Sequence, residues 1–373
     1  MVPALAVADA LRAEGAEVAF IGGERAEAEL VPAEGYELRQ IVVEGMSRTN
    51  PLRAVRALGR AGVAFLRARS VLKELKPDAV MGGGGYVAGP VGLAAVTLRI
   101  PLVLTEADSH LGLTNRVLAP AARRVCLAFP LAGRDGTRYR VTGRPVPPAR
   151  ADRAGARERL GPTAGRDCVL VFGGSLGARS INMAAVGAFA DATSEDATAP
   201  FEGLPDRSPP PVAAMQSAVT GTPSTGTAFD VLHVAGRRDY PELSARDLPE
   251  GYDLREYLDL EQFGDALAAA DLVVARAGGS VFEIAASGTP AILVPYPHAS
   301  ADHQTANARW MESAGAAVVI SDGELDASRL AQEVLELLAD RERLAAMASA
   351  SKGLARPDAA KDIADELLQA ARA

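Results

Sequence analysis

The sequence predicts an α/β protein built from two domains with parallel sheets. Segments typical of strands and of helices alternate almost throughout the chain, which is the pattern of parallel α/β domains. The length of 373 residues exceeds that of one ordinary domain and suits two. A strand, a glycine-rich turn and a helix follow one another at 168–184, and such a junction favours the binding of anions.

The first half of the chain contains six expected strands. Hydrophobic periodicity and turn residues set the boundaries. We expect strands at 17–22, 37–43, 78–82, 101–106, 123–129 and 138–143, and helices at 2–14, 24–33, 52–75 and 89–98. A parallel domain ordinarily opens with a strand and a phosphate-facing glycine turn. This chain opens in a helix, so we expect the first strand and loop of the domain to be missing.

The second half repeats the alternation after a proline-rich linker at 143–152. We expect strands at 168–172, 229–234, 252–257, 271–275, 291–294 and 316–320, with helices between them and a last helix at 356–372. Clustered Pro, Ser, Thr and Gly at 193–228 predict a disordered surface insertion. The domains expected are therefore 1–145, 146–355 and a C-terminal helix within 356–373.

Composition narrows the class of protein. The net charge of −8 argues against general affinity for nucleic acid. Cys126 and Cys168 lie in apolar stretches without metal-ligand spacing, which predicts buried, reduced thiols. No apolar run reaches the roughly 18 residues of a membrane span, and no signal peptide is evident. We therefore expect a cytoplasmic protein, with peripheral contact to a membrane left open.

The turn in VFGGSLGAR is the most informative motif. Gly173, Gly174, Ser175 and Gly177 stand between a buried strand and a helix, where the free backbone N–H groups and the helix dipole converge. No Lys follows the last glycine and the spacing is not GxGxxG, so the Walker and dinucleotide fingerprints do not apply. The motif predicts a site for a phosphorylated ligand.

Two further junctions join a strand to a helix through glycines. GGGGYVAGP at 82–90 is either a loop approached by substrate or a tight turn with close helix packing. RAGGSVFEIAASGTP at 276–290 carries Glu283 in the first turns of a helix. That carboxylate either pairs with sugar hydroxyls or interacts with the helix dipole.

Polar residues follow two other expected strands. In TEADSHLGLTN, Glu106 and Asp108 are candidate acids or bases and Asn115 is a candidate hydrogen-bonding group, although each could instead cap a helix or solvate a loop. The second group lies in PYPHASADHQTANA and comprises His298, Asp302, His303, Gln304 and Asn307. The His298–His303 spacing is not a recognised metal pair. Recognition of a sugar or phosphate suits Gln and Asn better.

The stretch 52–76 is basic and amphipathic. Its cations are Arg53, Arg56, Arg60, Arg67, Arg69, Lys73 and Lys76, against the single acid Glu74. On an acidic protein this pattern favours docking to an anionic membrane surface. The alternative is a solvated helix face with snorkelling arginines.

Taken in order, these motifs resemble the MurG family of glycosyltransferases. GGYVAGP, GLTN at 112–115, GGSLGAR, the turn before Glu283 and DHQTANA follow the family's order at about its spacing. The resemblance implies a GT-B fold, with two Rossmann-like domains facing a cleft. It also implies inverting transfer of N-acetylglucosamine from UDP-N-acetylglucosamine to undecaprenyl-linked lipid I, giving the peptidoglycan precursor lipid II at the cytoplasmic face of the membrane.

The resemblance implies a role for each matching residue. Ser175 would contact phosphate, Leu258 would lie beside the uracil, Glu283 would bind the ribose, Gly279 and Ser280 would lie near the diphosphate, and Gln304 with His303 would hold the sugar. Asp108 stands where an Asn that contacts the donor sugar is typical, and Asn115 falls in the acceptor-side motif. Pro147 replaces a nucleotide-contacting Arg, for which Arg144 or Arg150 could substitute. The turn before Glu283 is one residue shorter than usual.

The family's glycine loop, with the histidine suspected as general base, would precede Pro3 and is not in this sequence. We therefore expect the natural reading frame to begin upstream of Met1, and Glu106 and Asp108 are the only candidate bases we name. We expect no metal or cofactor, since the chain lacks the Asp-x-Asp signature of the other major glycosyltransferase fold. The alternatives are a glycolipid galactosyltransferase, a UDP-N-acetylglucosamine epimerase, or a UDP-sugar-binding protein with impaired catalysis.

Overall fold

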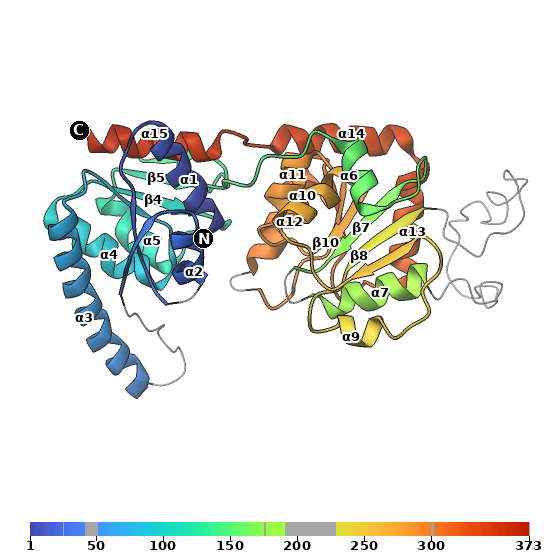
Figure 1. Cartoon of the computed structure of the whole chain (residues 1–373), viewed down its shortest axis with the longest axis horizontal. Helices are drawn as coiled ribbons and strands as arrows, with labels where there is room; N and C mark the ends of the chain where they lie inside the picture. Colours follow the sequence, from blue (N-terminus) through green and yellow to red (C-terminus); the bar gives the residue numbers. More distant parts are fainter. Residues whose placement is uncertain (25, 42–50, 175–176, 191–228, 300–301, 373) are drawn as a thin grey trace, which may run out of the picture.

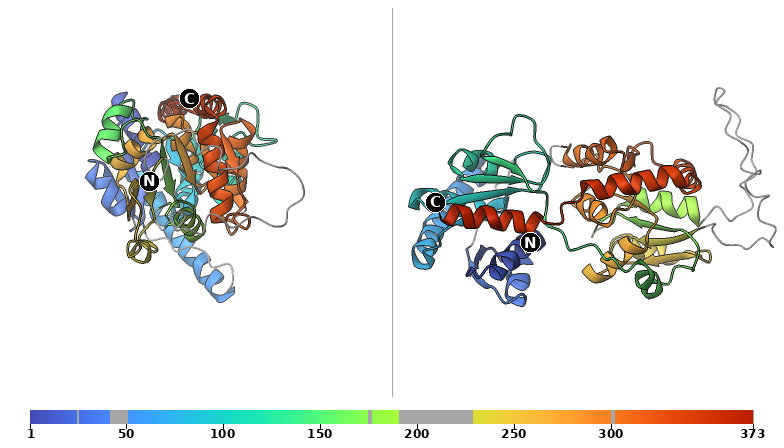
Figure 2. Two further views of the ribbon diagram at one scale, coloured as in Figure 1. Left: turned by 90° about the vertical axis from the view of Figure 1, so that its right-hand side faces the viewer. Right: turned by 90° about the horizontal axis from the view of Figure 1, so that it is seen from above.

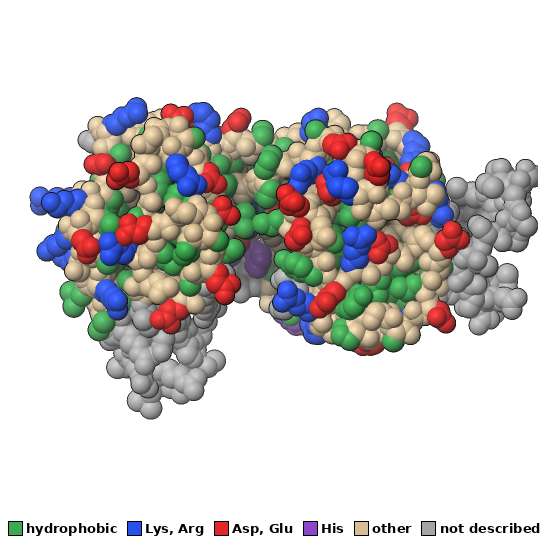
Figure 3. Space-filling view, viewed as in Figure 1, with side chains coloured by type: hydrophobic (Ala, Val, Ile, Leu, Met, Phe, Trp, Pro, Cys, Tyr) green, Lys and Arg blue, Asp and Glu red, His purple; other side chains and the backbone are tan. Residues whose placement is uncertain are grey.

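Two α/β domains lie side by side in the computed structural model of this chain (Figure 1). The structure describes residues 1–24, 26–41, 51–174, 177–190, 229–299 and 302–372, and for residues 26, 51–61 and 86 it describes the backbone alone. The insertion predicted at 193–228 lies outside the described residues. The space-filling view shows a furrow between the two domains (Figure 3).

The first domain contains two parallel sheets. One pairs β1 with β2, and the other has the order β3-β4-β5-β6. The strands are β1 (Ala19–Gly22), β2 (Glu37–Gln40), β3 (Val80–Gly82), β4 (Leu102–Glu106), β5 (Arg124–Leu127) and β6 (Tyr139–Val141). The helices are α1 (Val2–Ala13), α2 (Ala26–Ala33), α3 (Pro51–Leu75), α4 (Gly85–Leu98) and α5 (Leu113–Leu118).

The second domain contains one parallel sheet of six strands in the order β12-β11-β10-β7-β8-β9. These strands are β7 (Cys168–Phe172), β8 (Asp230–Val234), β9 (Tyr252–Arg255), β10 (Leu272–Ala275), β11 (Ala291–Leu293) and β12 (Ala317–Val319). The helices are α6 (Arg153–Leu160), α7 (Arg179–Phe189), α9 (Tyr240–Leu243), α10 (Leu260–Ala269), α11 (Val281–Ser287), α12 (His303–Ser313), α13 (Ala327–Ala339) and α14 (Arg341–Leu354). This is the common order of doubly wound sheets, and it reverses direction between β7 and β10.

The strands predicted from the sequence are all present, most of them shorter by one or two residues at an end; residues 42–43 of the second lie outside the described part. Two helix starts differ from the expected ones by three or more residues. The last helix begins at Ala359 rather than at 356. We expected another helix from 89, but α4 begins at Gly85. Gly84 and Gly85 adopt positive φ angles of 78° and 77°, which glycine reaches without strain, so the glycine run itself makes the tight entry into the helix.

The chain finishes on the first domain. The predicted last helix is present as α15 (Ala359–Ala371), which packs on α1, β4 and β5, as Figure 2 shows from above. Ile363 and Leu367 share a core with Val7 of α1. The carboxylate of Glu366 accepts hydrogen bonds from Arg124 and, at 2.8 Å, from Arg140. These contacts fasten the end of the chain to β5 and β6.

The two domains share an aromatic contact. Phe129, which follows β5, is buried in the core of the second domain. Its ring centroid lies 4.6 Å from that of Phe282 on α11 and 5.1 Å from that of Trp310 on α12. Because α11 and α12 also carry Glu283 and Gln304, this contact ties the position of both candidate site residues to the first domain.

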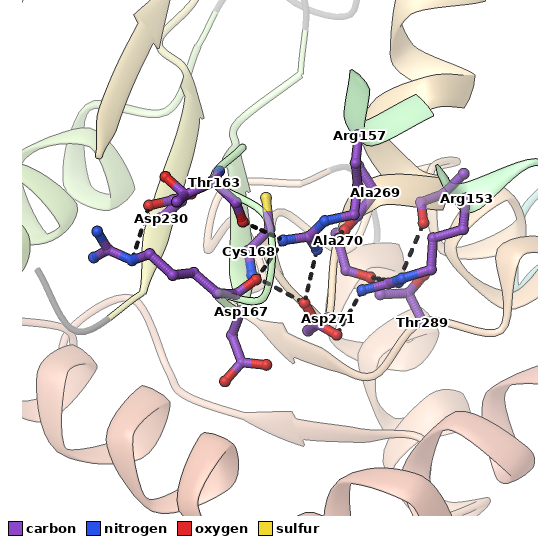
Figure 4. A network of polar contacts seen from close by, with 12 residues as sticks. Arg153, Arg157, Thr163, Asp167, Cys168, Asp230, Ala269, Ala270, Asp271 and Thr289 are labelled. Atoms are coloured by element: carbon purple, nitrogen blue, oxygen red, sulfur yellow. Dashed lines mark hydrogen bonds and ion pairs between the residues drawn. The ribbon is translucent and has the colours of Figure 1, made fainter. Parts of the chain in front are cut away.

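The amino-end edge of the second sheet is held by a polar network (Figure 4). The carboxylate of Asp271 accepts hydrogen bonds from Arg153 at 2.6 Å, Arg157 at 3.3 Å and the backbone N–H of Cys168 at 2.9 Å. The network joins α6 to the starts of β7 and β10. All of its charges are paired within the domain, which is typical of a structural network.

Both cysteines are buried and free, as the sequence predicts. Cys126 lies on β5 and Cys168 on β7. Burial raises the pKa of each thiol to about 12. Both therefore stay protonated at neutral pH and act as small apolar core side chains.

Candidate functional site

The carboxyl ends of β7 and β10 form the centre of the candidate site. These strands are neighbours in the sheet and flank the point where the strand order reverses. Open parallel sheets bind ligands at such a point, because the loops from the two strands diverge and leave a crevice. One glycine turn follows β7 at 173–178, and a second follows β10 at 276–280.

The first turn requires glycine at specific positions. Gly174 and Gly177 have positive φ angles of 89° and 80°. A Cβ atom on Gly173 would lie 2.2 Å from the backbone N of Ala178, and one on Gly177 would lie 2.1 Å from the carbonyl O of Ala235. The turn leads directly into α7, whose first N–H groups point toward it. Ser175, the predicted phosphate contact, lies outside the described residues.

The second turn lies against the linker between the domains. A Cβ atom on Gly279 would lie 2.6 Å from Nη1 of Arg144, so the guanidinium group packs directly over this glycine. Ser280 follows as the N-cap residue of α11. The structure thus brings together Arg144, Gly279 and Ser280, three residues that the sequence assigned to one site.

Glu283 faces a small cavity of about 30 Å³ beside this turn. Pro147, Arg150, Leu260 and Phe263 also line it. Burial raises the pKa of Glu283, and the nearby Arg144 partly offsets the rise. A carboxylate whose burial is only partly compensated is typical of a residue that awaits a ligand.

Leu258 is not part of this cavity wall. We expected Leu258 beside a base, but its side chain is buried in the core of the second domain. Leu260, two residues on, is 59% exposed and lines the cavity. Asp259 caps α10 in a capping box with Gln262, and this local geometry turns Leu258 inward and Leu260 outward. The capping pattern was readable in the sequence, but the direction of each side chain was not.

Gln304 lies between the loops that follow β10 and β11. Its Oε1 accepts a hydrogen bond from the backbone N–H of Tyr296 at 3.0 Å. Its Nε2 lies 3.9 Å from where a Cβ atom on Gly278 would be. His303 precedes it as the first residue of α12. Gln304 is therefore adjacent to the second glycine turn.

Arg276 is a site-forming residue that the sequence did not reveal. Its guanidinium group donates to the carbonyl groups of Val294 at 3.1 Å and Pro295 at 3.2 Å, and to the hydroxyl of Ser180 on α7 at 2.8 Å. It also pairs with Asp322 at 2.6 Å. Arg276 thereby joins the loops at the carboxyl ends of three strands to the start of α7. Its partners are distant in sequence, so no local pattern could have identified it.

In the first domain, Glu106 and Asn115 form one buried cluster at the end of β4. The carboxylate of Glu106 accepts hydrogen bonds from the backbone N–H groups of Gly112 at 2.8 Å and Asp108 at 3.2 Å, and from Nδ2 of Asn115 at 2.9 Å. These contacts favour a loop-holding role for Glu106. The side chain of Asp108 is partly exposed, and Oδ1 of Asn115 is buried without a hydrogen-bond partner among the described residues.

Within the described ranges, no group of three or more His, Cys, Asp or Glu side chains is arranged to hold a metal ion. In that same part of the chain, no helix is both long and apolar enough to cross a membrane. The start of α7 and the guanidinium of Arg144 are groups that could bind an anion.

Family models match both halves of the chain. Residues 1–127 match the glycosyltransferase family 28 N-terminal domain, and residues 168–363 match the glycosyltransferase family 28 C-terminal domain. Each matched range covers most of one structural domain. The glycine turns, Glu283 and Gln304 all lie within the second range.

Curated relatives match over nearly the whole chain. A protein of Moorella thermoacetica is 40% identical over 98% of this chain and 95% of its own length. A protein of Rubrobacter xylanophilus is 38% identical over 98% of this chain and 99% of its own length. Both are named UDP-N-acetylglucosamine–N-acetylmuramyl-(pentapeptide) pyrophosphoryl-undecaprenol N-acetylglucosamine transferase.

Solved structures also resemble this chain. MurG of Acinetobacter baumannii superposes with a TM-score of 0.71 at 29% identity, over 98% of this chain and 95% of that one. A UDP-GlcNAc 2-epimerase of Neisseria meningitidis, solved with UDP-GlcNAc, has a TM-score of 0.62 at 12% identity, over 99% of this chain and 96% of that one. The second likeness shows the shared two-domain fold alone.

Proposed function

Since the chain belongs to glycosyltransferase family 28 and, within it, to the MurG family, we propose that it transfers N-acetylglucosamine from UDP-N-acetylglucosamine to undecaprenyl-linked lipid I. The product is lipid II, the precursor of peptidoglycan. The observation that carries the proposal is the strained glycine turn between β7 and α7, at the point where the strand order reverses. Glu283 and Gln304 flank the same point.

The donor diphosphate binds at this turn. The first N–H groups of α7 have no partner within the helix, and the helix dipole favours negative charge at this end. The backbone at Gly279 and Ser280 contacts the diphosphate from the second turn, and Arg144, which packs on Gly279, adds a positive charge there. These groups stabilise the charge that grows on the departing UDP without reorganising during the reaction.

The nucleoside and the sugar bind on either side of the diphosphate. Glu283 accepts hydrogen bonds from the ribose hydroxyls, which relieves the uncompensated burial of its carboxylate. The uracil lies near the 257–260 loop, where Leu258 is buried in the core and Leu260 lines the cavity. Gln304 and His303 hold the N-acetylglucosamine ring through its hydroxyl groups.

The acceptor binds on the first domain, across the furrow from the donor. Its hydroxyl attacks the anomeric carbon from the face opposite the diphosphate. The new C–O bond forms as the bond to UDP breaks, so the configuration at that carbon inverts, and the hydroxyl proton passes to a general base. Of the two candidate carboxylates, Asp108 is the one accessible to substrate, because the oxygens of Glu106 already hold the 108–112 loop.

A transfer assay tests this function. The protein is incubated with UDP-N-acetylglucosamine, with and without lipid I, and both lipid II and free UDP are measured. We expect lipid II to form and UDP to appear only when lipid I is present. Release of UDP from the donor alone would instead identify an epimerase or a hydrolase and overturn the proposal.

A pair of glutamine variants tests the sugar site. Gln304→Ala should raise the KM for UDP-N-acetylglucosamine roughly tenfold, because a hydroxyl of the bound sugar loses its partner. Gln332→Ala is the matched control, since Gln332 is exposed on α13 and donates a hydrogen bond to Glu336 at 2.8 Å. An unchanged KM in Gln304→Ala would remove Gln304 from the sugar site.

We propose further that the first domain docks on the anionic, cytoplasmic face of the cell membrane through the 52–76 stretch and its neighbours. The helices α3, α4 and α5 pack side by side, and each exposes large apolar side chains. These are Val63, Leu66, Leu93, Leu113 and Val117. Arg67 and Lys73 of α3 are exposed on the same helix as two of them, whereas the side chains of 51–61 lie outside the described residues. Apolar insertion and attraction to anionic lipid act together on such a surface.

Vesicle sedimentation tests the docking. Leu66→Asp should lower binding to vesicles of phosphatidylglycerol and phosphatidylcholine by roughly tenfold, since it places a charge where an apolar side chain inserts. Leu335→Asp is the control, because Leu335 is a comparably exposed leucine on α13 of the second domain. Equal binding by both variants, or equal binding to vesicles of phosphatidylcholine alone, would contradict the proposed surface.

A further inference from the structure

A buried chain of polar side chains lies beneath the first glycine turn. Asn182 of α7 and His233 of β8 are both fully buried, and Tyr252 of β9 is nearly so. Nδ1 of His233 lies 2.7 Å from the hydroxyl of Tyr252, and Nε2 lies 3.0 Å from Oδ1 of Asn182. Polar groups buried between a helix and a parallel sheet cost free energy unless each one is hydrogen-bonded. In this chain of hydrogen-bonded side chains, each member is paired with the next.

The hydrogen bonds of the chain all run in one direction. Nδ2 of Asn182 donates to the carbonyl of Ala235 at 2.9 Å and to Asp239 at 2.8 Å, so Oδ1 of Asn182 is the acceptor toward His233. His233 therefore carries its proton on Nε2, and its Nδ1 accepts from the hydroxyl of Tyr252. Burial lowers the pKa of His233 to about 4, so the ring is neutral at physiological pH, as this pattern requires.

Asn182, at one end of this chain of hydrogen bonds, contacts the first glycine turn. The carbonyl of Ala235, which accepts from Asn182, is the same atom against which Gly177 packs. Nδ2 of Asn182 itself would lie 3.4 Å from a Cβ atom on Gly177. The backbone N–H of Asn182 donates to the carbonyl of Ala178 at 2.9 Å. Asn182 thus touches the last residues of the turn and holds the loop beneath it.

The chain of hydrogen bonds also leads, through Asp239, to two cations beside the turn. Asp239, the second acceptor of Asn182, pairs with Arg238 at 3.0 Å and with Arg179 at 3.8 Å. Arg179 is the first residue of α7, immediately after the turn. A shift of Asn182 would therefore move the turn, the 235–239 loop and the charges around them together.

We propose that Asn182 and His233 are positioning residues of the donor site, whose hydrogen-bonded chain sets the spacing between the glycine turn and the 235–239 loop and thereby the affinity for a nucleoside diphosphate. Neither side chain touches the ligand. The inference rests on the proposed function of the turn as the diphosphate site. Its physical basis is that converging N–H groups bind an anion well only when they are held to within a fraction of an ångström.

The test compares UDP with uridine, which lacks the phosphates. Binding of UDP is measured by titration calorimetry, and binding of uridine by competition with UDP. Asn182→Ala should raise the Kd for UDP roughly 10- to 100-fold and leave the Kd for uridine unchanged. His233→Gln keeps a hydrogen-bond donor toward Asn182. Its Kd for UDP should therefore rise less than that of Asn182→Ala. A purely structural role would weaken both ligands equally.

Two further variants keep the test decisive. Thr289→Val removes a buried hydroxyl that donates to the carbonyl of Leu267, just before β11. It should lower the melting temperature without changing the ratio of the Kd for UDP to the Kd for uridine. Tyr252→Phe removes the first donor of the chain and keeps the ring, so it serves if Asn182→Ala does not fold. If the unmodified protein binds UDP no better than uridine, the proposed role of the turn fails. If it discriminates and Asn182→Ala keeps that discrimination (or Tyr252→Phe, where Asn182→Ala does not fold), the positioning role is overturned.

Discussion

The two domains differ at the centre of their sheets. In the second domain β7 occupies the interior of a six-stranded sheet, pairs with β10 and β8, and has all five residues buried. In the first domain no described strand pairs with both β1 and β3, and β1 buries only its last residue, Gly22. A phosphate-binding turn needs a rigid strand behind it, because its backbone is strained. This difference supports our proposal that the donor binds to the second domain.

The first domain is held by a polar cluster, an ion pair and an aromatic contact. Its polar cluster at Glu106 and Asn115 holds a loop at the end of β4. Its sheet is tied to the end of the chain by Glu366 and to the second domain by Phe129. The polar cluster is local in sequence, whereas Glu366 and Phe129 contact residues more than 100 positions away. The following substitutions test this division, beginning with the largest expected effect.

Phe129→Ala tests whether the domains are energetically separate. We expect the free energy of unfolding of the second domain to fall by about 3–5 kcal/mol, because a cavity opens between Phe282 and Trp310. Trp310 is the single tryptophan, so its fluorescence in a urea titration reports on this core. Phe20→Ala, whose ring packs on Tyr36 within the first domain, should leave that transition in place. An unchanged midpoint in Phe129→Ala would make the domains independent.

Gly177→Ala tests the strained turn. The new methyl group would meet the carbonyl of Ala235 at 2.1 Å, and the residue would keep a positive φ of 80°. We expect the affinity for UDP to fall about 100-fold, measured by titration calorimetry. Gly165→Ala is the matched control, since Gly165 has a φ of 82° with open space around its Cβ position, at the opposite end of β7. An equal loss in the control would mean that general strain is responsible.

Glu366→Gln tests the attachment of α15. Burial alone would raise the pKa of Glu366, but hydrogen bonds from Arg140 and Arg124 outweigh it, and the pKa is lowered. A lowered pKa contributes stability that is present above the unfolded value near 4.5 and is lost as the pH falls through the folded value. The variant should lose about 2 kcal/mol in the free energy of unfolding at pH 7, with a smaller loss in acid.

Asp365→Asn is the control for that helix. Asp365 pairs with Lys361 on the outer side of α15, so its replacement should change the free energy of unfolding by no more than about 0.5 kcal/mol. Thermal unfolding at pH 7 and pH 4 measures both variants. If Glu366→Gln loses as much at pH 4 as at pH 7, the ion pairs are not the source of its effect.

Glu283→Gln should show the opposite dependence on pH. The pKa of Glu283 is raised by burial, so its contribution to stability is full below the unfolded value near 4.5 and is lost as the pH rises through the folded value. The variant keeps the neutral form and should be at least as stable as the parent at pH 7. Its affinity for UDP should fall roughly tenfold, because the acceptor for the ribose hydroxyls is weakened. A variant that is less stable at pH 7 and binds UDP normally would make Glu283 a structural residue.

Much of the site was predictable because its parts are local. Buried strands, glycine turns and the residues that follow them are adjacent in sequence, so the positions of Gly177, Gly279 and Glu283 could be identified from pattern alone. Side-chain direction was not predictable in the same way. Leu258 and Leu260 differ by two positions, yet one is in the core and the other lines the cavity. Arg276 and the Asn182–His233 pair were also missed, since their partners come from separate strands.

The sequence by itself determined the alternation of strands and helices, the turns that only glycine can form, and the family to which the chain belongs. These properties depend on local backbone conformation and on hydrophobic periodicity, which neighbouring residues decide. Only the tertiary structure decided that α15 returns to the first domain, that Phe129 enters the core of the second, and that a neutral His233 lies beneath the first glycine turn. Such contacts join residues from distant parts of the chain, and their energies exist only after the sheets have assembled.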